Sequence, residues 1–290
     1  MARTYGNQSM VAPLKRVLVR PPTERPEDVA RWQEFGYHFA PDVEETRRQH
    51  EGLTQLLRET GAEVAIAEEP QPELLDSIFV TDPGFVTDAG AIIGRMGKAL
   101  RRGEESALER ELTRLGIPIL GRLEGDATLE GGDVLWLDPD TLVIGRTYRS
   151  NDAGFQRVRE LLAGKVKNIH QVQMAHWHGR GEILHLLSVI SPVADDLALV
   201  YAPLMPIPLY EMLEARGIRT IEVPAEEFAT HAPNALAVAP GHVITLKGNP
   251  ITVGRLREHG VTVWEYEGRE LTLNRDGGAT CMTCCLLREY

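Results

Sequence analysis

Residues 104–120 read EESALERELTRLGIPIL, which predicts a helix over 104–115, a glycine at 116 and a short strand over 117–120. Gly116 fits the left-handed position that often follows a helix, because glycine has no Cβ to clash there. The same order of helix, glycine and strand occurs five times, at intervals of about 50 residues. The other copies are 43–60 with Gly61 and 63–67, 156–163 with Gly164 and 166–172, 209–216 with Gly217 and 219–223, and 252–259 with Gly260 and 261–264.

Further apolar runs lie between these copies and predict paired strands, and a first strand is expected at 14–20. The runs are 78–86 with 91–93, 134–144, 183–200 and 236–246. Units of this size cannot bury their own apolar faces and must pack on one another. The pattern indicates five α/β units closed on each other, with a central site lined by one loop from each. Since no Ser/Gly-rich linker interrupts them, residues 1–290 are expected to form one domain.

Bulk properties narrow the class of function. The 290 residues carry 31 basic and 42 acidic side chains, a formal charge of −11. This balance argues against nucleic acid as a partner and favours a small cationic substrate. No apolar run reaches the roughly 18–20 residues that span a bilayer, so no membrane partner is expected. The three clustered cysteines form no disulfide framework, and we expect a cytoplasmic location.

All three cysteines lie in residues 276–285, DGGATCMTCC. Two glycines just before Cys281 allow the backbone to approach a ligand, and a thiolate there is a candidate nucleophile. Cys284 and Cys285 are alternatives, and the CxxC spacing of Cys281 and Cys284 would also suit a redox pair. Because no second CxxC exists, a zinc ribbon is not expected. His176 and His178, on either side of Trp177, likewise lack further ligands at zinc spacing, so we expect no metal.

Acidic residues occur in two distinctive stretches. Residues 76–83, DSIFVTDP, place Asp76 and Asp82 at the ends of a short segment that is expected to be extended. Paired carboxylates can hold a guanidinium, although a solvated edge with a cap at Asp82 is the alternative. Glu130 and Asp133 flank two glycines at the start of an apolar run. If the two carboxylates are buried, they require charged or hydrogen-bonding partners. The alternative is an ordinary turn before a strand.

Two other features leave a functional and a structural interpretation open. His185 lies in the apolar run 183–190, as a catalyst or as a satisfied core residue. The polar and aromatic residues 23–42 have no clear period. A loop of this length is typical of a lid, or it covers the core.

Five motifs in order make the chain resemble the guanidine-modifying superfamily of arginine deiminases, amidinotransferases and dimethylarginine dimethylaminohydrolases. They are FVTD (79–82), LEGGDVL (129–135), RSN (149–151), LHL (184–186) and GGATC (277–281). The resemblance as a whole covers nearly the entire chain. The resemblance implies a five-bladed, pseudo-symmetric α/β propeller, the pentein fold, with a central active site.

The resemblance also implies roles for the reacting residues. Cys281 corresponds to the nucleophile that attacks the guanidinium carbon, and His185 to the general acid and base. Glu130 orients His185 or binds the guanidinium. No metal or organic cofactor is implied.

The remaining roles concern substrate binding. Asp82 corresponds to a second carboxylate on the guanidinium, and Asp76 contacts another polar group of the substrate. Phe79 belongs to the same substrate-binding motif. Arg149 and, by spacing, Arg101 bind the substrate carboxylate. The resemblance leaves a homo-oligomer open.

Three positions bear on the substrate. Thr81 stands where dimethylarginine hydrolases commonly have an acidic residue, and Asp82-Pro83 is more typical of deiminases. Leu187 stands two residues after the histidine, where deiminases and amidinotransferases usually have aspartate. A neutral side chain there leaves room for alkyl groups. The expected reaction is hydrolysis of an Nω-substituted, methylated arginine to citrulline and an amine. The alternatives are a deiminase, an amidinotransferase or a non-catalytic binder of guanidino compounds.

Overall fold

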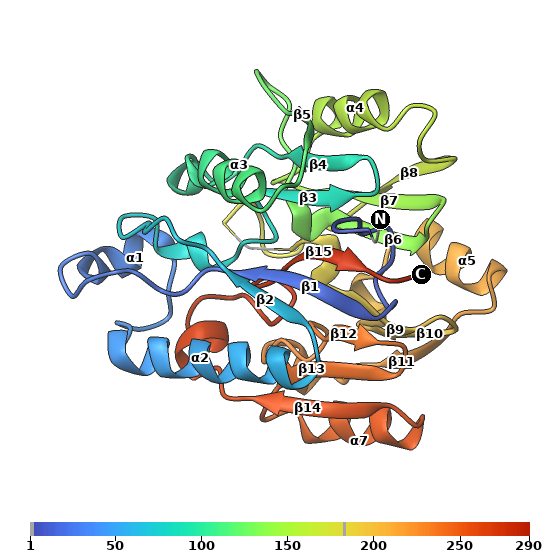
Figure 1. The fold of residues 1–290 in the computed structure, drawn as a ribbon. Coiled ribbons are helices and arrows are strands. Elements are labelled where there is room, and N and C mark those ends of the chain that lie inside the picture. Colours follow the sequence, from blue (N-terminus) through green and yellow to red (C-terminus); the bar gives the residue numbers. More distant parts are fainter. Residues whose placement is uncertain (1–2, 182–183) are drawn as a thin grey trace.

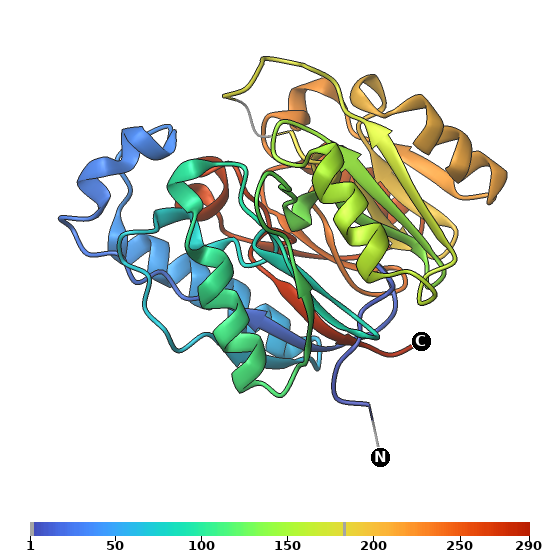
Figure 2. The same ribbon diagram turned by 90° about the horizontal axis from the view of Figure 1, so that it is seen from above.

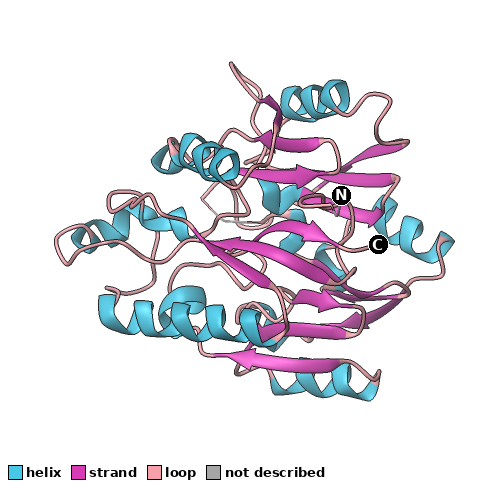
Figure 3. Ribbon diagram, in the orientation of Figure 1, coloured by secondary structure: helices cyan, strands magenta, loops and turns pink. Residues whose placement is uncertain are grey.

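The structure, a computed structural model, describes residues 3–181 and 184–290. Its strands form five three-stranded sheets, with the longer helices around the outside (Figures 1 and 3). We call each sheet with its helix a blade. The strands of blades 2 to 5 are β3 (Gly84–Thr87), β4 (Gly90–Ile93) and β5 (Ile119–Arg122); β6 (Val134–Asp138), β7 (Thr141–Arg146) and β8 (Asn168–Gln173); β9 (Ile190–Ala194), β10 (Leu197–Val200) and β11 (Arg219–Glu222); and β12 (Leu236–Ala239), β13 (His242–Leu246) and β14 (Thr262–Tyr266).

Every blade has the same design. Two antiparallel strands are followed by a helix, and the third strand returns to pair in parallel with the middle one. The helices are α2 (Val43–Glu59), α3 (Glu104–Arg114), α4 (Asp152–Leu161), α5 (Ile207–Ala215) and α7 (Pro250–Glu258). The glycine after each has a positive φ, between 67° and 88°, which confirms the predicted left-handed caps at Gly61, Gly116, Gly164, Gly217 and Gly260.

Blade 1 is assembled from both ends of the chain. Strand β1 (Leu14–Val19) pairs in parallel with β2 (Glu63–Ile66) and antiparallel with β15 (Cys284–Arg288), with Leu18 opposite Cys284. Strands β1 and β15, blue and red, lie side by side in both views (Figures 1 and 2). The same three-stranded design therefore closes the ring.

Five apolar clusters fill the spaces between neighbouring blades. One cluster, for example, joins Ile92 of blade 2 to Leu142 of blade 3, and another joins Leu135 of blade 3 to Val200 of blade 4. The other clusters join blades 4 and 5, 5 and 1, and 1 and 2. Each buried aliphatic side chain contributes about 1.5–3 kcal/mol to folding. The expectation of five α/β units packed on each other is confirmed.

The runs 78–86 with 91–93 and 183–200 contain the expected paired strands, but both begin with other structure, and the segment expected to be extended at 76–83 is not. Residues 75–78 form a 3₁₀ helix, η2 (Leu75–Ile78), and β3 begins only after Pro83, which has no N–H to donate to a sheet. In the run 183–200, Ile183 lies outside the described residues. After it comes a 3₁₀ turn, η5 (Leu186–Ser188), in which the backbone N–H of His185 donates to Ser188 Oγ at 3.1 Å.

The stretch 23–42 is partly helical, with η1 (Val29–Arg31) and α1 (Trp32–Phe35). Phe35 and Tyr37 pack on Leu75 and anchor it to the body. The remaining short elements are η3 (Ala99–Arg101), η4 (Gly131–Asp133), η6 (Ala202–Leu204), α6 (Ala225–Phe228) and the π-helical η7 (Arg269–Leu273). Among the described residues, every helix is too short or too polar to span a bilayer.

Replacing Gly217 by alanine is expected to destabilise the protein by about 1 kcal/mol, because φ is +67° there although the space around it is open. Gly254, inside α7 and equally open, is the matched control. Its replacement by alanine is expected to stabilise the protein by up to about 1 kcal/mol. Urea unfolding of both variants measures the two effects. Equal effects of the same sign would contradict the cap assignment.

Candidate active site

Five loops, one from each blade, deliver one polar residue each to the centre of the ring. Each loop immediately precedes the first strand of its blade. The residues are Asp82 before β3, Glu130 before β6, His185 before β9, Asn234 before β12 and Cys281 before β15. The blade repeat, rather than any local sequence motif, brings together positions separated by about 50 residues.

These loops surround a cavity of about 440 Å³. Seven of the eight side chains expected to form the site line it: Asp76, Phe79, Asp82, Arg101, Arg149, His185 and Cys281. Glu130, the eighth, lies fully buried behind His185. The structure therefore brings all eight together, with Glu130 set back from the space a ligand would occupy.

The imidazole of His185 is held from behind by a carboxylate. Its Nε2 lies 2.8 Å from Glu130 Oε2, and Glu130 Oε1 accepts from the Gly97 backbone N–H at 2.8 Å. Burial alone would lower the pKa of His185, but the charges of Asp133 and Asp82 and the bond to Glu130 raise it to about 9. Burial alone would raise the pKa of Glu130, yet His185 and Arg149 hold it well below its usual range. The pair is therefore charged at neutral pH.

Asp82 is oriented by three neighbours. Its Oδ1 accepts from the Gly132 backbone N–H at 3.2 Å and lies 4.0 Å from His185 Nδ1. Its Oδ2 lies 2.6 Å from Arg101 Nη1, and Arg101 also pairs with Glu104 at 2.7 Å. Burial raises the pKa of Glu104 to about 7 against the opposing charge of Arg101. An arginine of the protein thus occupies one side of Asp82.

The two glycines after Glu130 allow a close approach between blades. A Cβ on Gly132 would lie 2.5 Å from His185 Nδ1, and one on Gly131 would collide with the Thr81 carbonyl. Asp133 follows them and faces away from the cavity: it accepts from Leu186 N–H at 2.9 Å and Thr147 Oγ1 at 2.7 Å. Burial raises its pKa to about 6. Asp133 thereby fixes the turn that carries His185.

Cys281 is half-buried at the cavity wall, on a loop that Thr81 holds in place. The Thr81 N–H donates to the Cys281 carbonyl at 3.1 Å, and its hydroxyl lies 2.5 Å from the Thr280 carbonyl and 2.6 Å from that of Thr283. Burial and the charge of Asp82 raise the pKa of the Cys281 thiol to about 12. Thr81 therefore supports the cysteine loop.

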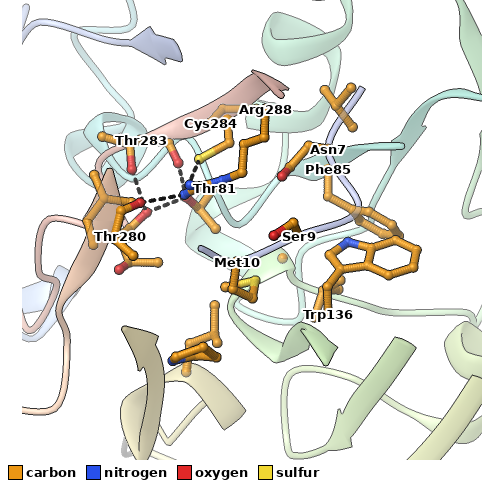
Figure 4. A pocket seen from close by; sticks show the side chains of 18 of the residues that line it. Asn7, Ser9, Met10, Thr81, Phe85, Trp136, Thr280, Thr283, Cys284 and Arg288 are labelled. Atoms are coloured by element: carbon orange, nitrogen blue, oxygen red, sulfur yellow. Dashed lines mark hydrogen bonds between the residues drawn. The ribbon is translucent and has the colours of Figure 1, made fainter. Parts of the chain in front are cut away.

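The other cysteines face a second space. Cys284 and Cys285 line a cavity of about 60 Å³, with Arg288 and the hydroxyls of Thr280 and Thr283 (Figure 4). Burial raises the pKa of Cys284 far above that of a free thiol. Of the three cysteines, Cys281 is the one that lines the larger cavity.

At another part of the cavity lies a lysine that the sequence analysis missed. Lys98 Nζ lies 2.7 Å from Asp76 Oδ2 and 2.7 Å from the Phe35 carbonyl. The other oxygen of Asp76 has no hydrogen-bond partner within residues 3–181 and 184–290. Among the described residues, the Arg149 guanidinium has one side-chain acceptor, Glu130 Oε1 at 3.5 Å. Arg149 therefore retains hydrogen-bonding capacity toward a ligand, whereas the unpartnered oxygen of Asp76 is enclosed by the protein.

A second feature missed from the sequence joins the cysteine loop to two histidines. Asp276 Oδ1 lies 3.0 Å from His38 Nε2 and 3.3 Å from His231 Nε2. Burial opposes ionisation of Asp276, but the two imidazoles lower its pKa overall. Three non-glycine residues with positive φ, namely Trp177, His231 and Asp276, all line the cavity. Such strained backbone is often found at functional sites.

Across the described part of the chain, one group could offer three ligand atoms to a metal. Its members are Asp82, Glu130 and His185, with ligand atoms within 4.8 Å of one another. The Glu130–His185 hydrogen bond and the Asp82–Arg101 ion pair already engage this group. We interpret it as a hydrogen-bonded network.

The chain is similar in sequence to dimethylarginine hydrolases and to arginine deiminases. A family model described as N,N dimethylarginine dimethylhydrolase, eukaryotic, matches residues 33–288. The N(G),N(G)-dimethylarginine dimethylaminohydrolase of Pseudomonas aeruginosa is 27% identical over 248 residues, covering 84% of this chain and 89% of that protein. Arginine deiminase of Listeria welshimeri is 28% identical over 261 residues, 76% of this chain. The chain spans only 63% of that deiminase's length.

Solved structures agree on the architecture. A dimethylarginine dimethylaminohydrolase adduct with 4-chloro-2-hydroxymethylpyridine has a TM-score of 0.74 at 25% identity, covering 93% of this chain and 99% of the other. The N-terminal domain of ArgZ, an arginine dihydrolase of cyanobacteria, has a TM-score of 0.79 at 24% identity, covering 94% and 97%. The expected five-bladed pentein fold is confirmed.

Replacing Glu130 by glutamine is expected to lower the unfolding free energy by about 3 kcal/mol at pH 6, because it breaks a buried ion pair. The pKa of His185 is raised in the folded state, so its contribution is complete below pH about 6.5 and is lost as the pH passes 9. The difference between parent and variant should therefore shrink by pH 10. Urea unfolding at both pH values measures it, with exposed Glu124→Gln as control. A constant difference would contradict the raised pKa.

Proposed function

Because the chain belongs to the N,N-dimethylarginine dimethylhydrolase family, whose model matches residues 33–288, we propose that it hydrolyses an Nω-methylated arginine to citrulline and an amine. One observation carries the proposal. The sulfur-bearing side chain of Cys281 and the imidazole of His185, backed by Glu130, line one cavity together with Asp76 and Asp82. This combination provides a nucleophile, a proton donor and anionic groups for a planar cation.

Binding places the guanidinium against carboxylates and the amino-acid end against charged side chains. Asp82 binds the guanidinium, and Asp76, which lines the same cavity, accepts a hydrogen bond from another polar group of the substrate. Arg149 binds the substrate carboxylate. Arg101 is already engaged by Asp82 and Glu104, so its proposed contact with the substrate carboxylate requires a rearrangement. Lys98, which lines the cavity beside Asp76, is an alternative cation for that contact.

The first chemical step forms a carbon–sulfur bond. Cys281 rests as a thiol, and the bound cation lowers the cost of its ionisation, with the proton released to solvent. The thiolate adds to the guanidinium carbon and gives a tetrahedral adduct. The bond to the methylated nitrogen then breaks, and imidazolium His185 donates a proton to the leaving amine. Its pKa of about 9 keeps that proton available at neutral pH.

The second step hydrolyses the amidino-thioether. Neutral His185 removes a proton from water as the oxygen attacks the same carbon. The carbon–sulfur bond breaks, Cys281 leaves as thiolate, the hydroxyl proton of the adduct passes to solvent, and the ureido group of citrulline remains. The net reaction consumes one water and releases one amine. Glu130 stabilises the imidazolium in both steps through its 2.8 Å hydrogen bond.

Substrate preference rests on two neutral residues. Leu187 is 4% exposed and lines the smaller cavity, not the cavity of Cys281 and His185, so the expected room for alkyl groups beside it is wrong; it still offers no carboxylate to a second guanidinium nitrogen. Thr81, in turn, is occupied with the cysteine loop. The lack of a carboxylate at Leu187 favours an alkylated guanidinium over arginine, whereas Thr81 lacks the acidic group that dimethylarginine hydrolases commonly have at this position. The single domain, the cytoplasmic location, a homo-oligomer and the lack of a metal requirement stay predictions.

The purified protein is expected to release citrulline from dimethylarginine or monomethylarginine faster than from arginine. Cys281→Ser should reduce the rate at least about a thousandfold, because the nucleophile is lost. Cys284→Ser and Cys285→Ser are the matched controls and should retain activity. Mass spectrometry of product mixtures measures each rate. Preferred turnover of arginine would indicate a deiminase, and ornithine formed only with an amine acceptor would indicate an amidinotransferase.

Replacing Arg149 by methionine is expected to raise KM by about 10- to 100-fold with a smaller change in kcat, since one charge-assisted contact to the substrate carboxylate is lost. Arg146→Met, which removes a half-exposed arginine outside the cavity lining, is the control. Steady-state kinetics on methylarginine separates the two constants. A fall in kcat at unchanged KM would contradict this role for Arg149.

A further inference from the structure

The blade repeat indicates a site residue that no sequence motif identified. Four of the five loops before the first strands carry the residues already discussed, Asp82, Glu130, His185 and Cys281. The equivalent loop of blade 5 ends in Asn234, two residues before β12. Asn234 is 6% exposed and lines the same cavity.

Its carboxamide contacts the sulfur directly. Asn234 Nδ2 lies 3.2 Å from Cys281 Sγ, and Asn234 Oδ1 accepts from the Thr280 backbone N–H at 3.0 Å. A backbone N–H can only donate, so the oxygen of the carboxamide must face Thr280. The NH₂ group is then directed at the sulfur, independently of how the two ends of the carboxamide were assigned.

The cysteine loop is shaped to admit this side chain. A Cβ on Gly278 would collide with the Asn234 carboxamide, and one on Gly277 would collide with the ring of Phe79. These close contacts explain why both positions before Cys281 in the loop are glycine. On the other side, the Asn234 N–H donates to the carbonyl of His231 at 3.0 Å. The strained φ of +56° at His231 is part of the turn that presents Asn234.

We propose that Asn234 is a catalytic residue of this site, donating a hydrogen bond that stabilises the Cys281 thiolate; this inference rests on the proposed function. The sulfur needs such a donor because its surroundings disfavour negative charge. Burial and Asp82 oppose ionisation, whereas hydrogen bonds from the Gly278 backbone and Asn234, and the charge of Arg101, favour it. Asn234 is the one side-chain donor to the sulfur given by the described residues.

The test measures the reactivity of the sulfur without substrate. Asn234→Asp keeps the shape and the acceptor for Thr280 but replaces the donor with an anion, and Asn234→Ala removes the group. At pH 8, alkylation of Cys281 by iodoacetamide should slow by about 4- to 15-fold in Asn234→Ala, and by more in Asn234→Asp. Mass spectrometry with fragment localisation follows Cys281, with Cys285 as internal reference. Asn168→Asp, an exposed position on β8, is the control for added charge and should react like the parent.

The loss of catalytic activity should follow the same order, with Asn234→Asp more affected than Asn234→Ala. For methylarginine, kcat/KM should fall at least about tenfold in Asn234→Ala and further in Asn234→Asp. Alkylation within twofold of the parent in Asn234→Asp would overturn the assignment, as would an equal change at Cys285. If the parent protein hydrolyses no guanidino compound, the proposed function fails while the alkylation result still decides the Asn234–Cys281 contact. If the parent is active and Asn234→Asp matches it in both measurements, only the inference about Asn234 fails.

Discussion

The structure depends on closing the ring. Each three-stranded sheet presents apolar side chains to a neighbour on either side, and five clusters fill the five spaces between blades. An open arrangement would leave two of these faces in water. Pairing of β1 with β15 removes the open edge by building one blade from both ends of the chain. The loops that precede the first strands then converge at the centre, so that burial of apolar surface also assembles the site.

Electrostatics at this centre follows from burial. Asp82, Glu130, Asp133 and Glu104 are almost fully enclosed, and enclosed charges are tolerated only when paired. His185, Arg101 and Arg149 pair with Asp82, Glu130 and Glu104, and Asp133 accepts hydrogen bonds from neutral donors instead. These surroundings raise the pKa values of His185 and Cys281, which favours a protonated imidazole and a neutral thiol before a cation binds. Both conditions suit a reaction that begins when a cation enters and that needs an acid for the leaving amine.

Local signals in the sequence predicted much of the fold. Helix, glycine cap and parallel strand are specified by residues close together in the chain, and all five copies are present. Helix α4 nevertheless begins at Asp152, earlier than expected, because the Asn151 side chain caps Gly154 N–H. The motif residues were recognisable by type and order. Asn234, Lys98 and the Asp276 bridge were missed because they lie in loops without periodicity, and their partners are between 22 and 238 residues away in the chain. Only the three-dimensional repeat shows that Asn234 is the equivalent of the other four positions.

The Arg101–Asp82 ion pair has a consequence for turnover. Asp82 always has an internal competitor at 2.6 Å, so an incoming guanidinium must compete with it, whereas a neutral urea cannot do so with equal strength. On the proposed reaction, the conversion of a cation into an uncharged group removes the electrostatic hold on the product. Asp82 then keeps its internal partner, and the ureido group loses its electrostatic attraction to this carboxylate. Loss of the ligand's positive charge during the reaction would thus promote release of the product.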